Sequence, residues 1–235
     1  MLFSAHLANT SPLKAIRRKT PGPETVPGLL PARNGISAPF HDGALPRPQL
    51  SRETMVACWE DEDALDRFLA EDRTGTVFAE GWTLRLELFR AVGVWPGLEG
   101  APVHEAAAEG TEGDGPTVAI TIGTAYFRTI VPFLKVNNGL ESQFLTAENT
   151  IWGTAFSNIP QLLVGTLSVW ESGDSALDYM RSGAHTAAVK AHYDPKKDPT
   201  GHTYVTGGGF FGFRPISSTG SVGGKNPVSA EMLGL

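Results

Sequence analysis

The sequence predicts an α+β protein whose two halves repeat one order of strands and helices. The evidence for the repeat is three short identical segments that occur in both halves: Trp-Glu at 59–60 and 170–171, Ala-Leu-Asp at 64–66 and 176–178, and Phe-Arg at 89–90 and 213–214. The matches follow the same order in both halves, and each lies in a strand–helix–strand context. With an earlier strand and helix in each half, the order becomes β-α-β-β-α-β. This order predicts a tandem duplication of ferredoxin-like units that pack against each other.

The first half contains three well-marked elements after its opening strand, 1–8, and helix, 11–19. Residues 54–59 form a short apolar run that is typical of a strand. The acidic residues at 60–63 suit the positive end of a helix dipole, and the apolar residues behind them have helical spacing. Residues 82–90 alternate apolar and polar side chains, which is typical of a half-buried strand.

The second half repeats these signals over a longer stretch of chain. We expect a strand that ends at Trp170, a helix that opens at 171–174, and a closing strand that ends at Arg214. Trp59 and Trp170 end equivalent strands, and we interpret both as core residues that pack on the following helix. The earlier elements expected in this half are a strand at 117–124, a helix at 125–134 and a further strand at 142–146.

Two segments rich in glycine and proline interrupt the pattern. The segment 97–116 is acidic and aperiodic, which predicts a linker. The expected organisation is therefore an N-terminal half, 1–96, a linker, 97–116, and a C-terminal half, 117–235. The other segment, 21–48, is interpreted either as an ordered loop around a pocket or as irregular surface.

Composition and charge exclude several classes of protein. The formal net charge of −6 argues against nucleic-acid binding, because proteins that bind nucleic acid usually carry an excess of positive charge. No apolar run reaches the roughly 18 residues of a membrane-spanning helix, and the N-terminal residues do not resemble a signal peptide. Cys58 is the single cysteine, so no internal disulfide and no cysteine-based zinc site are expected. These features favour a reducing compartment, and we expect a cytoplasmic protein.

Part of the second half resembles a known family. Residues 160–172 read PQLLVGTLSVWES, Ala-Leu-Asp-Tyr follows at 176–179, and Gly-Ala-His-Thr-Ala-Ala-Val follows at 183–189. This block is similar to the spheroidene monooxygenase family, within the dimeric α/β-barrel superfamily. The resemblance implies a dimeric α/β-barrel-type fold, a haem cofactor, an apolar, carotenoid-like substrate and an electron donor partner.

The resemblance also indicates the candidate site residues. His185 has no counterpart in the first half, where residues 72–75 read Asp-Arg-Thr-Gly, and it is the expected axial ligand of a haem iron. His192 follows seven residues later near the same helix face, as an alternative ligand or a distal partner. Arg214 is a candidate partner for a haem propionate. The alternatives remain open: His185 hydrogen-bonds the preceding strand, and Arg214 lies solvated on the outer sheet face.

Three functions remain open at this stage. The first is a haem-dependent monooxygenase-like protein, in which Phe127, Phe133, Phe144, Trp152 and Phe156 line a pocket or, equally, form a core. The second is a non-catalytic barrel that binds a small apolar ligand, which the departure from the family pattern at 190–195 favours. The third is a cofactor-free oxygenase with an apolar pocket. No catalytic residue is assigned, and a homo-oligomer remains possible because the duplication can satisfy internally the pairing that dimerisation supplies elsewhere.

Overall fold

The computed structural model describes residues 1–43, 46–98, 103–111, 113–158, 161–192 and 205–235. The first half contains β1 (Leu2–Asn9), α1 (Pro12–Arg17), β2 (Leu29–Pro39), β3 (Arg52–Trp59), α2 (Glu62–Glu71), α3 (Gly75–Ala79) and β4 (Trp82–Val94). After α4 (Val103–Glu109), the second half contains β5 (Thr117–Ala125), η1 (Phe127–Thr129), α5 (Ile130–Thr146), β6 (Thr150–Asn158), β7 (Leu163–Trp170), α6 (Gly173–Arg181), α7 (Gly183–His192), β8 (Val205–Thr219) and η3 (Glu231–Leu233).

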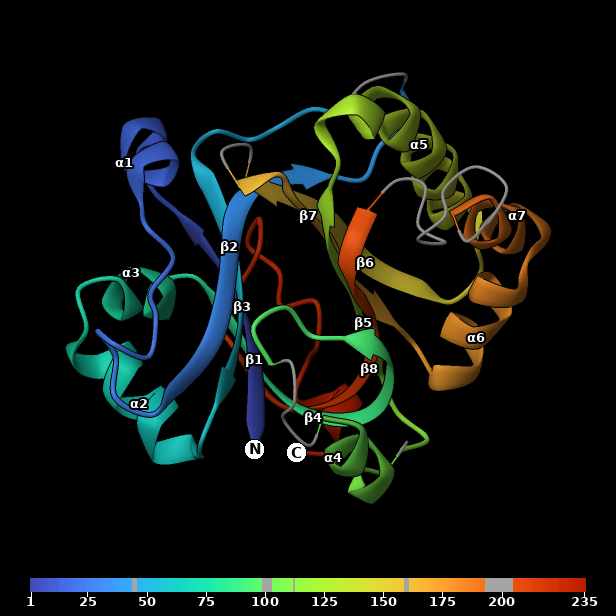
Figure 1. Cartoon of the computed structure of the whole chain (residues 1–235). Coiled ribbons are helices and arrows are strands. Elements are labelled where there is room, and N and C mark those ends of the chain that lie inside the picture. The colour runs from blue at the N-terminus through green and yellow to red at the C-terminus, as the bar shows by residue number, and fades with distance from the viewer. Residues whose placement is uncertain (44–45, 99–102, 112, 159–160, 193–204) are drawn as a thin grey trace.

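Eight strands of the described chain close into a barrel in the order β1-β3-β2-β6-β7-β5-β8-β4. Every neighbouring pair is antiparallel, and the two half-sheets join at β2–β6 and at β4–β8. The barrel therefore closes within one chain and leaves no open sheet edge. Helices α1 to α3 lie on one side of the barrel, α5 to α7 lie on the other, and α4 lies near the two termini (Figure 1).

The two halves share one topology. The strand order is β4-β1-β3-β2 in the first half and β8-β5-β7-β6 in the second, so each half-sheet places its last strand beside its first. The expected mixed fold with the element order β-α-β-β-α-β is present in both halves. A duplication event, a dimeric state and the domain boundaries remain predictions.

Each half also places a tryptophan and a helix cap at the end of its third strand. Trp59 packs against Phe68 of α2, with ring centroids 5.0 Å apart, and Trp170 packs against Tyr179 of α6 at 4.9 Å. Two residues after each tryptophan, a side-chain oxygen of Asp61 or Ser172 accepts a hydrogen bond from the backbone of the first helical turn, at 2.8 and 3.2 Å. The interpretation of both tryptophans as core residues is confirmed.

The barrel interior is a packed apolar core. One cluster of buried side chains draws on all strands except β2 and includes Phe3, Val56, Leu86, Ile120 and Phe156. Trp95, which follows β4, is fully buried and lies 5.0–6.3 Å from the rings of three interior phenylalanines: Phe3, Phe211 and Phe213. Burial of a large apolar side chain stabilises a fold by about 1.5–3 kcal/mol, so these rings hold the strands together rather than line an open channel.

Two sequence-based expectations in the second half were wrong. The helix expected at 125–134 begins at Ile130, because Thr117–Ala125 continues as a strand. The strand expected at 142–146 is instead the last part of α5. Its residue Phe144 packs on Trp170 at 4.9 Å, and the helical conformation brings the ring to that tryptophan.

The two segments rich in glycine and proline both contain regular structure. The segment 21–48 contains β2, which pairs with β3 on one side and with β6 on the other. The segment 97–116 contains α4, whose Val103 and Ala107 are buried against the barrel core. Within the described ranges, no helix combines the length and the apolarity that crossing a bilayer requires.

Candidate functional site

The barrel register aligns the outer faces of the two half-sheets residue by residue. Leu2 pairs with Trp59 in the first half, and Thr117 pairs with Trp170 in the second. His6 of β1 and Thr121 of β5 therefore hold the same position, four residues further along. Because side chains alternate along a strand, both point to the outer face, where the helices lie.

In the first half this position is filled. The His6 ring is fully buried, its Nδ1 lies 3.0 Å from Thr83 Oγ1, and its Nε2 lies 2.7 Å from Ser4 Oγ. Ser4 Oγ also accepts a hydrogen bond of 2.7 Å from the indole of Trp59. Burial, aided by the charge of Arg85, lowers the pKa of His6 to about 3, so the imidazole is neutral at physiological pH.

In the second half the same position is open. Thr121 is exposed although it lies in the middle of β5, and its outer-face neighbours Ala155, Val164 and Thr166 are only half-buried. Glycines occupy two further outer-face positions, Gly153 and Gly212. Among the described residues, this face therefore carries small side chains around an exposed Thr121, with the rings of Phe40 and Phe144 over Gly153.

The difference arises from how the helices pack. In the first half, α3 packs directly on β1 and β4, and its Phe78 stacks 5.6 Å from the His6 ring. In the second half, the main contacts of α7 among the described residues are with α5 and α6, and α6 packs on β5 and β7. Within the described part of the chain, the helical layer therefore buries His6 in the first half and leaves Thr121 exposed in the second.

A chain of aromatic rings borders this open face. It runs from Phe40 after β2 through Phe144 of α5 and Trp170 of β7 to Tyr179 of α6, with successive centroids 4.9 Å apart. The next ring is His185 of α7, 5.5 Å from Tyr179. Trp170 donates a hydrogen bond of 2.9 Å to Ser168 Oγ, which fixes the indole in the middle of the chain.

His185, the expected ligand, is the last ring of this aromatic chain. Its side chain is half-buried, and Nδ1 is buried without a hydrogen-bond partner among the described residues. Burial lowers the pKa of the imidazole, and a hydrogen bond with the backbone of Met180 opposes that shift. A neutral imidazole is the form that binds metals, so its protonation state suits a ligand role.

A buried carboxyl group lies close to this aromatic chain. Glu141 of α5 is 5% exposed and accepts a hydrogen bond of 2.5 Å from Asn137. Burial raises the pKa of Glu141 to about 7, although hydrogen bonds from the His41 backbone and from Asn137 oppose the shift. Burial and the charge of Glu141 together raise the pKa of Tyr179. The ring nitrogens of His41 are buried and have no partner among the described residues.

The sequence analysis missed Glu141 and His41. The available signal was the four-residue spacing of Asn137 and Glu141, which places both on one helix face. Nothing in the local sequence brings His41 to α5, because that contact depends on how the segment after β2 is placed.

The other two expected site residues are Arg214 and His192. Arg214 of β8 pairs with Glu87 of β4, and its Nε donates a hydrogen bond of 2.8 Å to Glu87 Oε2. His192 is the last residue of α7, and its side chain lies outside the described residues. Of the five aromatic residues expected to line a pocket, Phe156 lies in the barrel core, whereas Phe127 is 82% exposed.

The described residues meet two requirements of a haem site and leave one unmet. His185 supplies a neutral imidazole with an unpartnered buried nitrogen, and the outer face offers small side chains around an exposed Thr121. The cation expected for a propionate, Arg214, is held by Glu87. No group of three or more histidine, cysteine, aspartate and glutamate side chains gathers as a metal centre within the described ranges.

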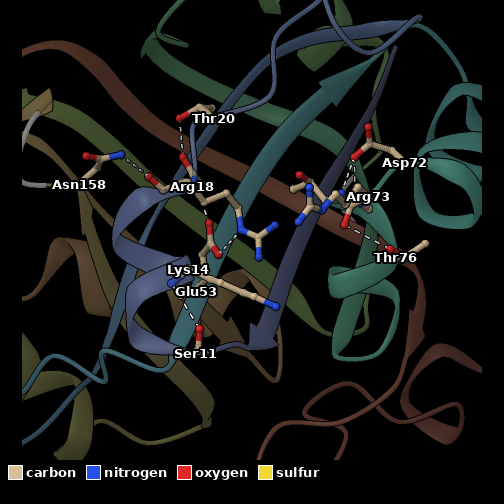
Figure 2. A network of polar contacts seen from close by, with 12 residues as sticks. Ser11, Lys14, Arg18, Thr20, Glu53, Asp72, Arg73, Thr76 and Asn158 are labelled. Atoms are coloured by element: carbon tan, nitrogen blue, oxygen red, sulfur yellow. Dashed lines mark hydrogen bonds and ion pairs between the residues drawn. The ribbon is translucent and has the colours of Figure 1, made fainter.

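A second polar cluster lies on the outer face of the first half (Figure 2). Glu53 of β3 is 1% exposed and accepts hydrogen bonds from Arg18 at 2.7 Å and from Asn34 at 2.6 Å. Thr20 in turn donates a hydrogen bond to Asn34. Burial raises the pKa of Glu53, and the bonds from Asn34 and Arg18 oppose the shift. Both carboxylate oxygens are satisfied, so this cluster ties the chain after α1 to the sheet.

Comparison with known proteins gives distant structural likenesses alone. No family model matches the chain, and no curated protein matches its sequence. A Fusobacterium nucleatum protein whose name gives monooxygenase as its expected activity has 10% identity and a TM-score of 0.42, over 96% of each chain. A Listeria monocytogenes ferredoxin-fold protein related to antibiotic biosynthesis monooxygenases has 11% identity and a TM-score of 0.36, over 92% of this chain and 95% of that one. A heme-degrading enzyme from Listeria monocytogenes has 8% identity and a TM-score of 0.35, over 90% and 98%. These values are too low to carry an argument about this chain.

Proposed function

We propose that this chain is a monooxygenase-like protein that holds a flat apolar molecule against the outer face of its second half-sheet. The observation that carries the proposal is the asymmetry of one register position. His6 fills that position in the first half, whereas Thr121 leaves it open in the second. Small-molecule sites are usually concave and mostly apolar, with a few polar groups that fix the orientation of the ligand.

Haem is the cofactor we propose for this face, with His185 as its axial ligand. The lowered pKa of the imidazole and the buried Nδ1, which has no hydrogen-bond partner among the described residues, support that role. When bound, haem would supply oxygen activation. The aromatic chain from Phe144 to Tyr179 excludes water from one side of the face and offers ring surface to an apolar, carotenoid-like substrate. We also propose that the protein has an electron donor as a partner.

Two other expected roles are retained as parts of the same proposal. His192 is the alternative axial ligand, and Arg214 is the partner of a propionate, which requires Arg214 to exchange Glu87 for that carboxylate. The barrel closes within one chain, so a second copy of the protein is not required to complete it.

A second candidate function is favoured by Glu141. A buried carboxyl whose pKa is raised to about 7 can give or take a proton near neutral pH. Glu141 raises the pKa of Tyr179, whose ring centroid lies 5.5 Å from that of His185. A cofactor-free oxygenase, or a barrel that only binds an apolar ligand, uses the same open face without haem.

The test is a titration of the purified chain with haem, followed by the Soret absorption. We expect saturable binding that His185→Ala weakens at least tenfold, with the Soret band lost or displaced, because the axial bond is removed. The matched control is His104→Ala, which removes an exposed imidazole on α4. An unchanged Soret band in His185→Ala excludes His185 as the ligand. A wild-type chain that binds an apolar dye but does not bind haem favours the second candidate function, in which the open face works without haem.

A further inference from the structure

The helix α1 carries its large apolar side chains on the side that faces solvent. Leu13 is 58% exposed and Ile16 is 60% exposed, whereas the small residue Ala15 is buried. At 3.6 residues per turn, Leu13 lies about 160° around the helix from Ala15, so it points away from the sheet. This helix therefore buries its smallest side chain and leaves an apolar face uncovered within the described part of the chain.

The helix in the equivalent position of the second half packs in the opposite way. α5 buries Phe144, whose ring lies 4.9 Å from the indole of Trp170. In the first half, α1 lies at the periphery of the molecule (Figure 1). The exposed face of α1 is thus available to a partner outside the chain.

A third apolar side chain is exposed close to the start of α1. Leu50 is 48% exposed, and the next residue, Ser51, accepts a hydrogen bond of 2.8 Å at its carbonyl from the backbone of Thr10. Thr10 lies two residues before the helix begins. The apolar character of this surface therefore does not depend on α1 alone.

Basic residues accompany the apolar face. Lys14, Arg17 and Lys19 are exposed, and the first acidic residue of the chain is Glu24. The chain as a whole carries a net charge of −6, so this positive segment is a local departure from its average. A positive surface with apolar side chains is complementary to a partner that is both anionic and apolar.

Two contacts hold α1 in this orientation. Ser11 caps the first turn, where its hydroxyl oxygen accepts a hydrogen bond of 3.4 Å from the backbone of Lys14. Arg18, directly after the helix, donates from Nε to the buried carboxylate of Glu53 at 2.7 Å (Figure 2). Because Arg18 is bound to the sheet on one side, the exposed face of the helix is fixed on the other.

We propose that α1 docks the protein on an anionic lipid surface. Leu13 and Ile16 enter the boundary between headgroups and acyl chains, and the three exposed basic residues contact the acidic headgroups. A nucleic acid meets the same cations but offers no acyl chains to Leu13 and Ile16. A second copy of the chain, joined through the same face, places like charges against each other. The inference is independent of the proposed haem site.

The test is co-sedimentation of the full-length chain with vesicles of phosphatidylcholine alone or mixed with phosphatidylserine. We expect the mixed vesicles to bind at least tenfold more tightly, and we expect added salt to weaken this binding because it screens the headgroup charge. Equal binding to the two kinds of vesicle overturns the proposal, and so does absence of binding to the mixed vesicles at low salt. A chain that dimerises through this face instead, and becomes monomeric when Leu13 and Ile16 are replaced, also contradicts it.

Variants of exposed residues locate the contact. Leu13→Ser combined with Ile16→Ser is expected to weaken binding to the mixed vesicles at least tenfold, with Phe127→Ser, which removes an 82% exposed ring from the second half, as control.

Arg17→Gln tests the charge separately. We expect it to weaken binding about fivefold, the contribution of one basic residue near an anionic surface, whereas the exposed Lys225→Gln leaves binding unchanged. Unchanged binding in a folded Leu13→Ser, Ile16→Ser variant or in Arg17→Gln contradicts the docking role of α1, and so does an equal loss in a control.

Discussion

Thr121 and His6 occupy one register position in two half-sheets, and their surroundings differ completely. His6 is enclosed by Ser4, Thr83 and Phe78, whereas Thr121 is exposed. A buried histidine with both nitrogens bonded is a structural residue, because its pKa of about 3 keeps the ring neutral throughout the physiological pH range. The exposed position, Thr121, is therefore the one at which the proposed ligand meets the sheet.

The Thr121→Trp variant tests this position. An indole at Thr121 covers the open centre of the face, so we expect haem affinity, measured by Soret titration, to fall at least tenfold. Thr219→Trp places the same side chain at the exposed end of β8 and serves as the control for expression and folding. Haem binding that is equal in the two variants places the site elsewhere.

The carboxyl of Glu141 makes stability depend on pH. Its pKa is about 7 in the folded chain and 4.5 in the unfolded chain, so between these values the folded state binds more protons. The free energy of unfolding then decreases as the pH rises from 4.5 to 7, by about 2 kcal/mol once partial solvation is allowed for.

The Glu141→Gln variant is expected to remove most of this pH dependence. Glutamine still accepts the hydrogen bonds from Asn137 and from the His41 backbone, so the fold is kept. Urea unfolding at pH 5 and at pH 8 measures the effect, with the exposed Glu148→Gln as control. The idea is contradicted if Glu141→Gln and wild type lose the same stability between these two values.

Sequence reasoning singled out His185 as a candidate but not its neighbours. A histidine without a counterpart in the repeated half is visible in the sequence alone. The pairing of Arg214 with Glu87 depends on the β4–β8 join, and the burial of Glu141 depends on how α5 meets the segment after β2. Both the Arg214–Glu87 pair and the burial of Glu141 depend on tertiary packing, which the spacing of residues in the sequence does not predict.

At the scale of elements, the sequence predicted the strands that carry strong local patterns. The runs that end at Trp59 and Trp170 and the alternating run from Trp82 are strands β3, β7 and β4. β2 was not predicted, because Pro31, Gly35 and Pro39 weaken its local signal. Its strand conformation depends on pairing with β3 and with β6.

Gly35 shows how closely β2 meets β6. A Cβ added there lies 2.5 Å from the carbonyl oxygen of Ser157 and 2.9 Å from its nitrogen, so backbone has to move. We expect Gly35→Ala to lower the free energy of unfolding by about 1–3 kcal/mol, as measured by urea denaturation.

Gly139 provides the matched control for Gly35. It lies in α5 with no atom within 4 Å of an added Cβ. Gly139→Ala is expected to raise stability by about 0.5–1 kcal/mol, since alanine restricts the unfolded chain and favours the helix. A Gly35→Ala variant as stable as wild type shows that the β2–β6 join is looser than described.

At the scale of the whole molecule, closing the barrel fills its interior with aromatic and aliphatic side chains, with Trp95 among them. Among the described residues, the centre of the outer face of the second half is left exposed, and the proposed function places its ligand there.

The most direct test of the central claim is the absorption spectrum of the full-length chain expressed with haem supplied, recorded before and after dithionite. The proposal predicts one haem for each chain, with a Soret band that shifts on reduction. A folded chain that is colourless and gives no Soret band with added haem contradicts the haem-dependent function.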